Sequence, residues 1–352
     1  MVTLQSPDPP EEAVFPAIVL NFGPAWWFAH YGMKFDQEFW QDPVARTERW
    51  REQKRLLYER FGELGLGEKD PRPHPIAGEA YGHRFMSAFW GCEIQYVPDQ
   101  YPSALVLADP YERMKNLTVP SLAESPAVQR LQSEVRTLRQ HYGSCETAIN
   151  FGGPINNAVS VLGSEIFVVC KQEPELARSV LQKMGEAVLA VYDGLVCPLN
   201  GISIGEGRKR YFEIGDCPVG MVSPQTYQEM ILPADLWLRS QFRGRFGLHH
   251  CGIFEPYAQV YRPLKFDCLD VGPGSDLGLT RAAYPDIPIT TYLAVESLIG
   301  ISQKDLDANL VKMIREGAPA RLFPTITVAE AGPEVSDEIV RYLLTASERL
   351  HL

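Results

Sequence analysis

Short apolar runs alternate with longer amphipathic segments along most of the chain. The run FPAIVLNFG (residues 15–23) is β-branched and apolar and ends in Asn-Phe-Gly, which predicts a buried strand that runs into a loop. In the segment 39–65, apolar residues recur near helical spacing with charged residues between them, which predicts an amphipathic surface helix. Stronger helical patterns follow at 174–196 and 223–242, the second opening on Ser223-Pro224, an N-cap followed by proline in the first turn.

The strand-then-helix order recurs to the end of the chain without a domain-like linker. Further strand-like runs lie at 147–154, 210–216, 245–252, 266–272, 287–295 and 321–327. Repeated βα units of this kind favour a single-domain (β/α)8 TIM barrel over residues 15–352, with an irregular N-terminal region and a disordered or extended arm at 1–14. An open doubly wound sheet is the alternative, but its G-x-G-x-x-G turn is missing after the first strand, and GPGSDLG (272–278) matches it poorly.

Composition narrows the class of protein. The 352 residues are 45% hydrophobic and 22% charged, which predicts a globular chain with a sizeable core. A formal net charge of −11 without a run of lysines or arginines argues against nucleic acid as a partner. We expect a cytoplasmic protein, because neither a secretory signal nor a long apolar stretch is visible. Seven cysteines without a C-x-x-C motif indicate core thiols with one or two metal ligands, not a disulfide framework.

In a TIM barrel the reacting groups lie in the loops that follow the strands. The loops NFGPAWWFAHYG, NFGGPINN, IGDCPVGMVSP and LHHCG would then share one rim. The first of them is rich in aromatic rings, including Trp26 and Trp27, which suits an apolar or aromatic ligand. The alternative is that these rings pack the barrel mouth.

The stretch LHHCG predicts a metal site. His249 and Cys251 are two apart on a strand and point to the same side, whereas His250 points to the other. Thiolate and imidazole are preferred zinc ligands, and a catalytic zinc would need one more protein ligand and an open position. The sequence leaves four candidates for that ligand, which are Asp216, Cys217, Cys268 and Glu330.

Three motifs carry a resemblance to a known family. NFGGPINNAVSVLGSEIF, GDCPVGMVSPQTYQEMILP and LHHCG resemble elements of the uroporphyrinogen decarboxylase superfamily, and the last is similar to the His-x-Cys-Gly element of its corrinoid-linked methyltransferase branch. The resemblance covers roughly residues 145–350. It implies a TIM barrel and either decarboxylation or methyl transfer with a cobalamin-carrying corrinoid protein as partner. Barrel enzymes of this kind often pair, so a homodimer is a further expectation.

Two departures from the family's patterns choose between its branches. Decarboxylases that act on porphyrinogens carry an arginine-rich loop after the first strand, and the loop NFGPAWWFAHYGMKF has no arginine. Relatives that activate thiols supply a second cysteine near the last barrel strand, and RLFPTITVAEAGPE has none.

We therefore expect a zinc-assisted O-demethylase that passes the methyl group of a small aromatic O-methyl donor to a corrinoid protein. A methyltransferase acting on a thiol or folate, and a decarboxylase, are the alternatives. The expected site has His249 and Cys251 on zinc and Asp216 with His250 in catalytic roles. The expected substrate-binding residues are Asn21, Trp26, Trp27 and Asn156.

Overall fold

Eight parallel strands form the barrel in a computed structural model that describes residues 18–318 and 324–350, without the side chains of 329, 330 and 347. The predicted arm at 1–14 lies outside the described residues. The barrel strands are β1 (Ile18–Phe22), β2 (Ile76–Ala77), β5 (Glu146–Thr147), β6 (Phe212–Gly215), β7 (Phe246–His250), β8 (Cys268–Val271), β9 (Ile289–Tyr292) and β10 (Thr325–Ala331). The remaining two strands, β3 (Ile94–Gln95) and β4 (Ser103–Ala104), pair antiparallel as a hairpin.

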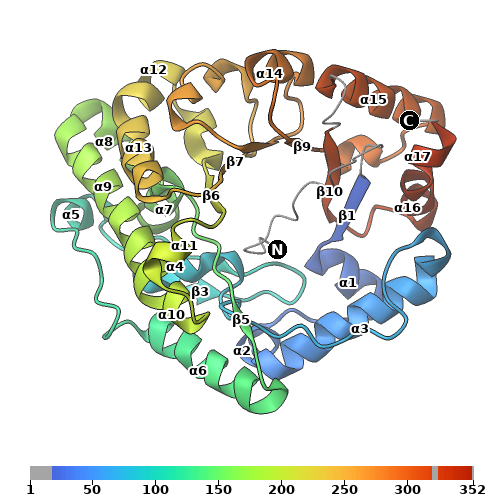
Figure 1. Cartoon of the computed structure of the whole chain (residues 1–352), viewed down its shortest axis with the longest axis horizontal. Coiled ribbons are helices and arrows are strands. Elements are labelled where there is room, and N and C mark those ends of the chain that lie inside the picture. The colour runs from blue at the N-terminus through green and yellow to red at the C-terminus, as the bar shows by residue number, and fades with distance from the viewer. Residues whose placement is uncertain (1–17, 319–323, 351–352) are drawn as a thin grey trace.

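The barrel strands fall into two hydrogen-bonded groups. Six pair in the order β1-β10-β9-β8-β7-β6, and β2 pairs with β5. Between the groups, the Gly153 amide donates to the Gly215 carbonyl oxygen at 2.8 Å and ties the loop after β5 to the end of β6. The TIM barrel predicted from the sequence is confirmed, and the ring of strands and outer helices is visible in Figure 1.

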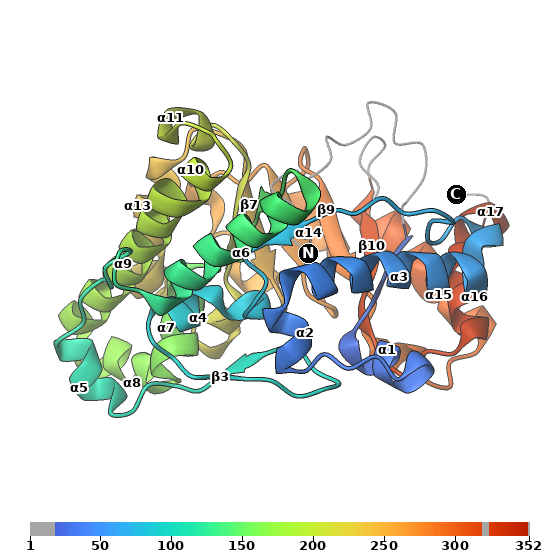
Figure 2. The ribbon, with the colours of Figure 1, turned by 90° about the horizontal axis from the view of Figure 1, so that it is seen from below.

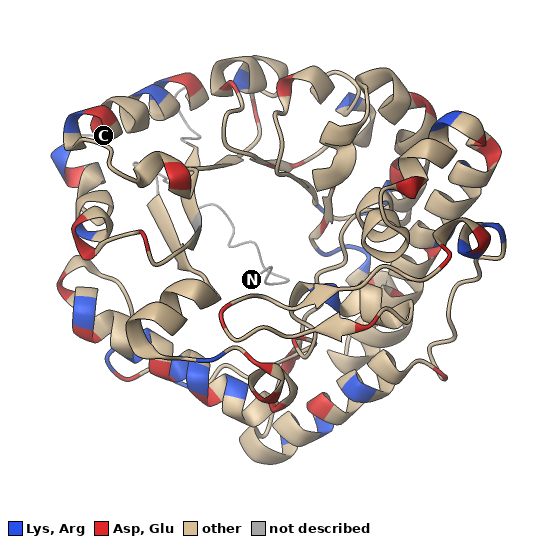
Figure 3. Cartoon of the chain, turned by 180° about the vertical axis from the view of Figure 1, so that it is seen from behind, with Lys and Arg blue, Asp and Glu red and all other residues tan. Residues whose placement is uncertain are grey.

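Helices enclose the strands on the outside of the ring (Figure 1). They are α1 (Pro24–Tyr31), α2 (Gln37–Gln41), α3 (Pro43–Phe61), α4 (Phe85–Phe89), α5 (Pro110–Lys115), α6 (Pro126–Tyr142), α7 (Pro154–Leu162), α8 (Glu165–Gln172), α9 (Pro174–Val191), α10 (Cys197–Leu199), α11 (Ile204–Gly207), α12 (Pro224–Thr226), α13 (Leu232–Gln241), α14 (Leu277–Ala283), α15 (Gln303–Gly317), α16 (Asp337–Leu344) and α17 (Ala346–Arg349). Lysines and arginines are scattered over these outer helices among acidic residues (Figure 3).

Alternate residues of each long strand pack outward against the helices. Ile214, Leu248 and Leu269 are almost completely buried in this layer, as the period of two along a strand requires. The other set of positions points into the barrel, and there the residues are mostly only half-buried. The hydrophobic core therefore lies between sheet and helices, and polar side chains collect inside.

The region 72–128, where the sequence predicts no strand, supplies β2 and the β3–β4 hairpin. β2 lies beside a buried ion pair between α3 and α6, in which the Arg46 guanidinium donates to Glu134 Oε1 at 2.9 Å. The second Glu134 oxygen accepts from the Gly78 amide, directly after β2. Figure 2 shows the hairpin at the same end of the barrel as α1, the end where the strands terminate. The hairpin therefore belongs to the functional face.

Helix ends follow local chemistry. The segment 39–65 begins its long helix only at Pro43, because Asp42 caps α3 by accepting hydrogen bonds from two amides of its first turn. The helix that begins at Pro154 is interrupted at Gly163, where the backbone takes a positive φ of 74° and α7 gives way to α8. None of the helices in the described ranges has the length and apolar character needed to cross a membrane.

Candidate functional site

Three metal-ligating side chains meet where β6 and β7 end. Cys217 follows β6, His249 lies on β7, and Cys251 follows that strand directly. Their ligand atoms all lie within 4.8 Å of one another, with Cys251 Sγ at 2.8 Å from Cys217 Sγ and 2.9 Å from His249 Nε2. We call these three residues the metal centre. Of the four candidates for the third ligand, the structure brings Cys217 to the predicted pair.

Strand register brings the two loops together. Gly215 pairs with His249, and the amide of Asp216 donates to the His249 carbonyl oxygen at 2.8 Å, so the residue that follows Asp216 is held beside the end of β7. On the other side, the end of β8 approaches the Cys251 backbone very closely. A Cβ at Gly272 would lie 1.8 Å from the Cys251 carbonyl oxygen, so this position requires glycine.

The three side chains share protons through short contacts. The hydrogen bond from Cys251 lowers the pKa of Cys217 to about 4 despite burial, with a further contribution from His249. The same contact with Cys217 raises the pKa of Cys251. Burial alone would lower the pKa of His249, but its hydrogen bonds to Asp270 and the two cysteines outweigh burial and raise it. A metal ion that binds here would meet a thiolate at Cys217 and would displace the protons held by the His249 imidazole and the Cys251 thiol.

Asp270 and Tyr292 fix the imidazole from behind. Asp270 Oδ2 lies 2.7 Å from His249 Nδ1 and also accepts a hydrogen bond from the Tyr292 hydroxyl. With Nδ1 engaged, Nε2 is the nitrogen that faces the cysteines. A carboxylate on the far nitrogen is the usual outer partner of a metal-bound histidine, and it raises the basicity of the ligand.

Replacing Asp270 with asparagine should lower zinc affinity about 10- to 100-fold, the typical effect of losing such an outer carboxylate. The amide keeps the size of the side chain but removes the negative charge that favours Nδ1–H. Chelator competition on the purified variant measures the change. Asp276→Asn is the control, since that carboxylate caps α14 away from the metal centre. Equal zinc affinities in the two variants would contradict the role.

Asp216 and His250, the predicted catalytic residues, both lie on the outward side and are completely buried. The Asp216 carboxyl lies beside Tyr261 and Asp235, and burial followed by the negative charge of Cys217 raises its pKa to about 7. His250 Nδ1 is 3.1 Å from the Tyr261 hydroxyl, and burial lowers the pKa of the imidazole. These contacts position the two strand ends, and neither side chain joins the metal centre.

The predicted substrate-binding residues divide into two groups. Trp26 is 0% and Trp27 4% exposed, in the core around Phe22 and Phe61. The structure thus places both indoles in the packing layer, not at the mouth. Asn21, by contrast, is exposed on β1.

Asn156 belongs with the accessible group. Its amide nitrogen lies 3.0 Å from where a Cβ of Gly215 would be, next to the loop that carries Cys217. Its Oδ1 atom is buried and makes no hydrogen bond within the described structure.

The other candidates for the third ligand are accounted for separately. Cys268 lies deeper inside the barrel, where its sulfur is 3.3 Å from the Tyr211 hydroxyl. Asp216 faces outward, as described above. The side chain of Glu330 lies outside what the structure describes.

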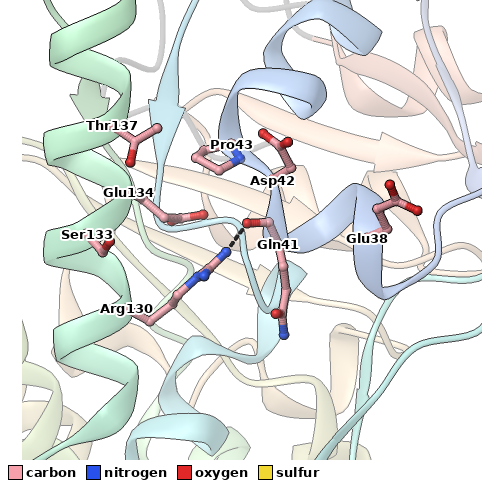
Figure 4. Close-up of a pocket in the computed structure, with 8 residues that line it drawn as sticks. All are labelled: Glu38, Gln41, Asp42, Pro43, Arg130, Ser133, Glu134 and Thr137. Carbon is pink, nitrogen blue, oxygen red and sulfur yellow. Dashed lines mark hydrogen bonds between the residues drawn. The ribbon is translucent and has the colours of Figure 1, made fainter.

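A polar pocket of about 340 Å³ is found elsewhere, on the outer wall between α2, the start of α3 and α6 (Figure 4). Its residues include Glu38, Asp42 and Arg130, and the Arg130 guanidinium is already bonded to the Gln41 carbonyl oxygen. None of the metal-centre residues lines it. This pocket is therefore separate from the candidate metal site at the barrel mouth.

Sequence reasoning missed Asp270 and Tyr292. The available signal was a polar residue at an inward position near the end of each strand, in FDCLDVG and ITTYLAV. Its meaning depended on β8 lying next to β7 and on β9 lying next to β8, which the pairings of His249 with Asp270 and of Asp270 with Thr290 now establish.

A methyltransferase from Methanosarcina mazei has a similar structure, with a TM-score of 0.64 at 14% identity over 98% of this chain and 96% of that one. A putative vitamin-B12 independent methionine synthase from Listeria monocytogenes aligns with a TM-score of 0.41 at 11% identity over 96% of each chain. No curated protein matches the sequence.

The family comparison is more specific. The family model described as uroporphyrinogen decarboxylase (URO-D) matches residues 85–322, about two-thirds of the chain, and this span includes all three metal-centre residues. The match begins well before residue 145, where the sequence resemblance was first apparent. The chain belongs to the uroporphyrinogen decarboxylase (URO-D) family.

Proposed function

We propose that this chain is a zinc-dependent methyltransferase that moves a methyl group from a corrinoid protein to a thiol. The observation that carries the proposal is the donor set of the metal centre, two cysteines and one histidine with no further ligand among the described side chains. Three protein ligands with an open position are typical of catalytic zinc. The structural likeness to a methyltransferase and the URO-D family membership support the same class of reaction.

The residues present fit a zinc ion. Cys217, His249 and Cys251 offer soft sulfur and imidazole donors, and Asp270 holds the tautomer that leaves Nε2 free for a metal. When bound, zinc would supply a Lewis acid that stabilises a substrate thiol as its thiolate. The two cysteines contribute negative charge that weakens attraction for a neutral ether oxygen and makes a bound thiolate a better nucleophile.

This donor set favours methyl transfer to a thiol, whereas the sequence favoured O-demethylation. O-demethylation was preferred because a second cysteine was missing near the last strand and because Trp26 and Trp27 offered an aromatic surface. Cys217 supplies the second cysteine from another loop, and both indoles lie in the core. In the proposed direction the substrate sulfur attacks the methyl carbon, and both electrons of the cobalt–carbon bond stay on cobalt.

The test is a pair of reactions with the zinc-loaded protein. Methylcobalamin and 2-mercaptoethanol should give cob(I)alamin and the methyl thioether, followed by visible absorbance and mass spectrometry. The Cys251→Ala variant should lose this activity at least a hundredfold, because the donor set is broken. Production of methylcobalamin from cob(I)alamin and an aryl methyl ether, without thiol methylation, would instead establish O-demethylation. Activity in neither direction would overturn the methyltransferase proposal.

A further inference from the structure

The inner face of the barrel below the metal centre, which we call the chamber, is lined by polar and small side chains that are mostly only half-buried. Thr290, Thr325 and Thr327 occupy inward positions on β9 and β10, and glycines occupy inward positions 215 and 247 on β6 and β7. TIM-barrel interiors are ordinarily filled by large branched aliphatic side chains. Here Val19, in the middle of β1, remains 39% exposed. The partial exposure of these inward positions makes the inner face accessible to a ligand that extends from the metal centre into the barrel.

A held carboxylate faces this space. Glu213 is the inward residue of β6 that lies two positions before Gly215, the partner of His249. The Tyr211 hydroxyl donates a hydrogen bond to Glu213. The oxygen of this hydroxyl lies 2.2 Å from where a Cβ of Gly247 would be. Glycine at 247 therefore admits the tyrosine that holds the carboxylate in place. Two residues along a strand separate the carboxylate level from the metal level by roughly 7 Å.

The chamber offers hydrogen-bond acceptors and negative charge. Besides Glu213, the Oδ1 atoms of Asp270 and Asn156 are buried and have no hydrogen-bond partner within the described structure. Within the bounds of the strands of the six-stranded sheet, the inward positions of the described residues hold no lysine or arginine. Arg245 directly precedes β7, at the end of the barrel opposite the metal centre, where its charge acts on Cys268. Burial disfavours the charged form of Glu213 and so raises its pKa above the ordinary value. A bound cation would offset this cost of burying the carboxylate. An anionic tail would place its charge beside the carboxyl groups of Glu213 and Asp270.

We propose that the acceptor thiol carries an amino group, which binds as an ammonium ion to Glu213 while the sulfur takes the open position of the metal centre. The proposal rests on the proposed function and names its substrate class as an aminothiol. The ammonium donates to Glu213 and to the free oxygens of Asp270 or Asn156. A thiol that ends in a sulfonate or carboxylate would place its negative charge beside Glu213 and Asp270 and would bind more weakly.

The experiment uses the full chain loaded with Co²⁺ in place of zinc, because a thiolate that joins the metal changes the visible spectrum of cobalt. Three probes share one carbon chain and differ only at the far end: 3-aminopropane-1-thiol, 3-mercaptopropan-1-ol and 3-mercaptopropane-1-sulfonate. At pH 8 all three should alter the spectrum. The amine should bind about 10- to 100-fold more tightly than the alcohol, as expected for a charge-assisted hydrogen bond, and the sulfonate should bind most weakly.

Variants assign the effect to Glu213. Glu213→Gln should bind the amine no more tightly than the alcohol while keeping its cobalt, whereas Glu206→Gln, at an exposed carboxylate paired with Lys209, should keep the preference. Equal affinities in the unmodified protein, tightest binding of the sulfonate, or a preference that survives Glu213→Gln would overturn the aminothiol proposal and leave thiol activation intact. If no thiol changes the cobalt spectrum, the proposed function itself fails. Should Glu213→Gln not fold, the probe series on the unmodified protein decides.

Discussion

Replacing Cys217 with alanine is expected to lower the affinity for zinc roughly a thousandfold, because it removes one of three protein ligands from a site whose total binding free energy is on the order of 10 kcal/mol or more. Cys217 Sγ lies 2.8 Å from Cys251 Sγ, and no further described His, Cys, Asp or Glu joins these residues as a potential metal ligand. The purified variant should contain little zinc by elemental analysis. Chelator competition on the reconstituted variant gives the affinity.

Cys268→Ala is the matched control for this loss. Cys268 is also a partly buried thiol of the barrel interior, but its sulfur contacts Tyr211 and lies outside the metal centre. Its removal should leave zinc content unchanged. A full zinc content in Cys217→Ala together with a loss of zinc from Cys268→Ala would contradict the assignment of the third ligand. Circular dichroism of both variants verifies that the fold is intact.

The pair His249 and Cys251 could be predicted because both lie on one strand. The period of two along a strand needs no knowledge of the rest of the fold, and it also sent His250 to the opposite face. The structure agrees, since His250 is completely buried beside Tyr261. Local geometry was therefore enough for two ligands and for the residue that does not join them.

The third ligand could not be chosen from the sequence because it depends on strand register. Cys217 is 34 residues from Cys251, and the two meet only because Gly215 pairs with His249. A shift of register by two residues would present a different side chain at the end of β6. The same reasoning covers Asp270, whose contact with His249 depends on β8 lying beside β7.

The barrel itself could be predicted from the βα rhythm, but its second strand could not, and the run expected at 147–154 overlaps the third strand, β5, only at its last residue. β2 and β5 each contain only two residues in regular pairing. Such strands carry no readable alternation, and they are held by contacts from outside the sheet, such as that of Glu134 with the Gly78 amide. Periodicity fails where tertiary contacts replace a strand's own pattern.

The aromatic stretch after β1, which forms α1, allowed two interpretations from the sequence for a physical reason. Clustered rings suit a ligand pocket and a core equally well, and composition does not separate the two. The centroid of the Trp26 ring lies 4.3 Å from that of Phe22 and 4.9 Å from that of Trp27. The Arg60 guanidinium lies 5.1 Å from the Trp26 centroid. The stretch closes the core beneath β1, and the exposed inward side of that strand belongs to Asn21 and Val19.

Trp26→Ala is therefore expected to reduce the free energy of unfolding by about 3–5 kcal/mol, the cost of removing a large aromatic side chain from a packed core. Phe28→Ala on the same helix is the control, because Phe28 is 40% exposed and its loss should cost less than about 1 kcal/mol. Urea denaturation of both zinc-loaded variants measures the difference. The folded Trp26→Ala protein should bind thiols at the metal centre with unchanged affinity, since the indole lies in the packing layer. A variant that keeps full stability but loses thiol binding would return Trp26 to the substrate site.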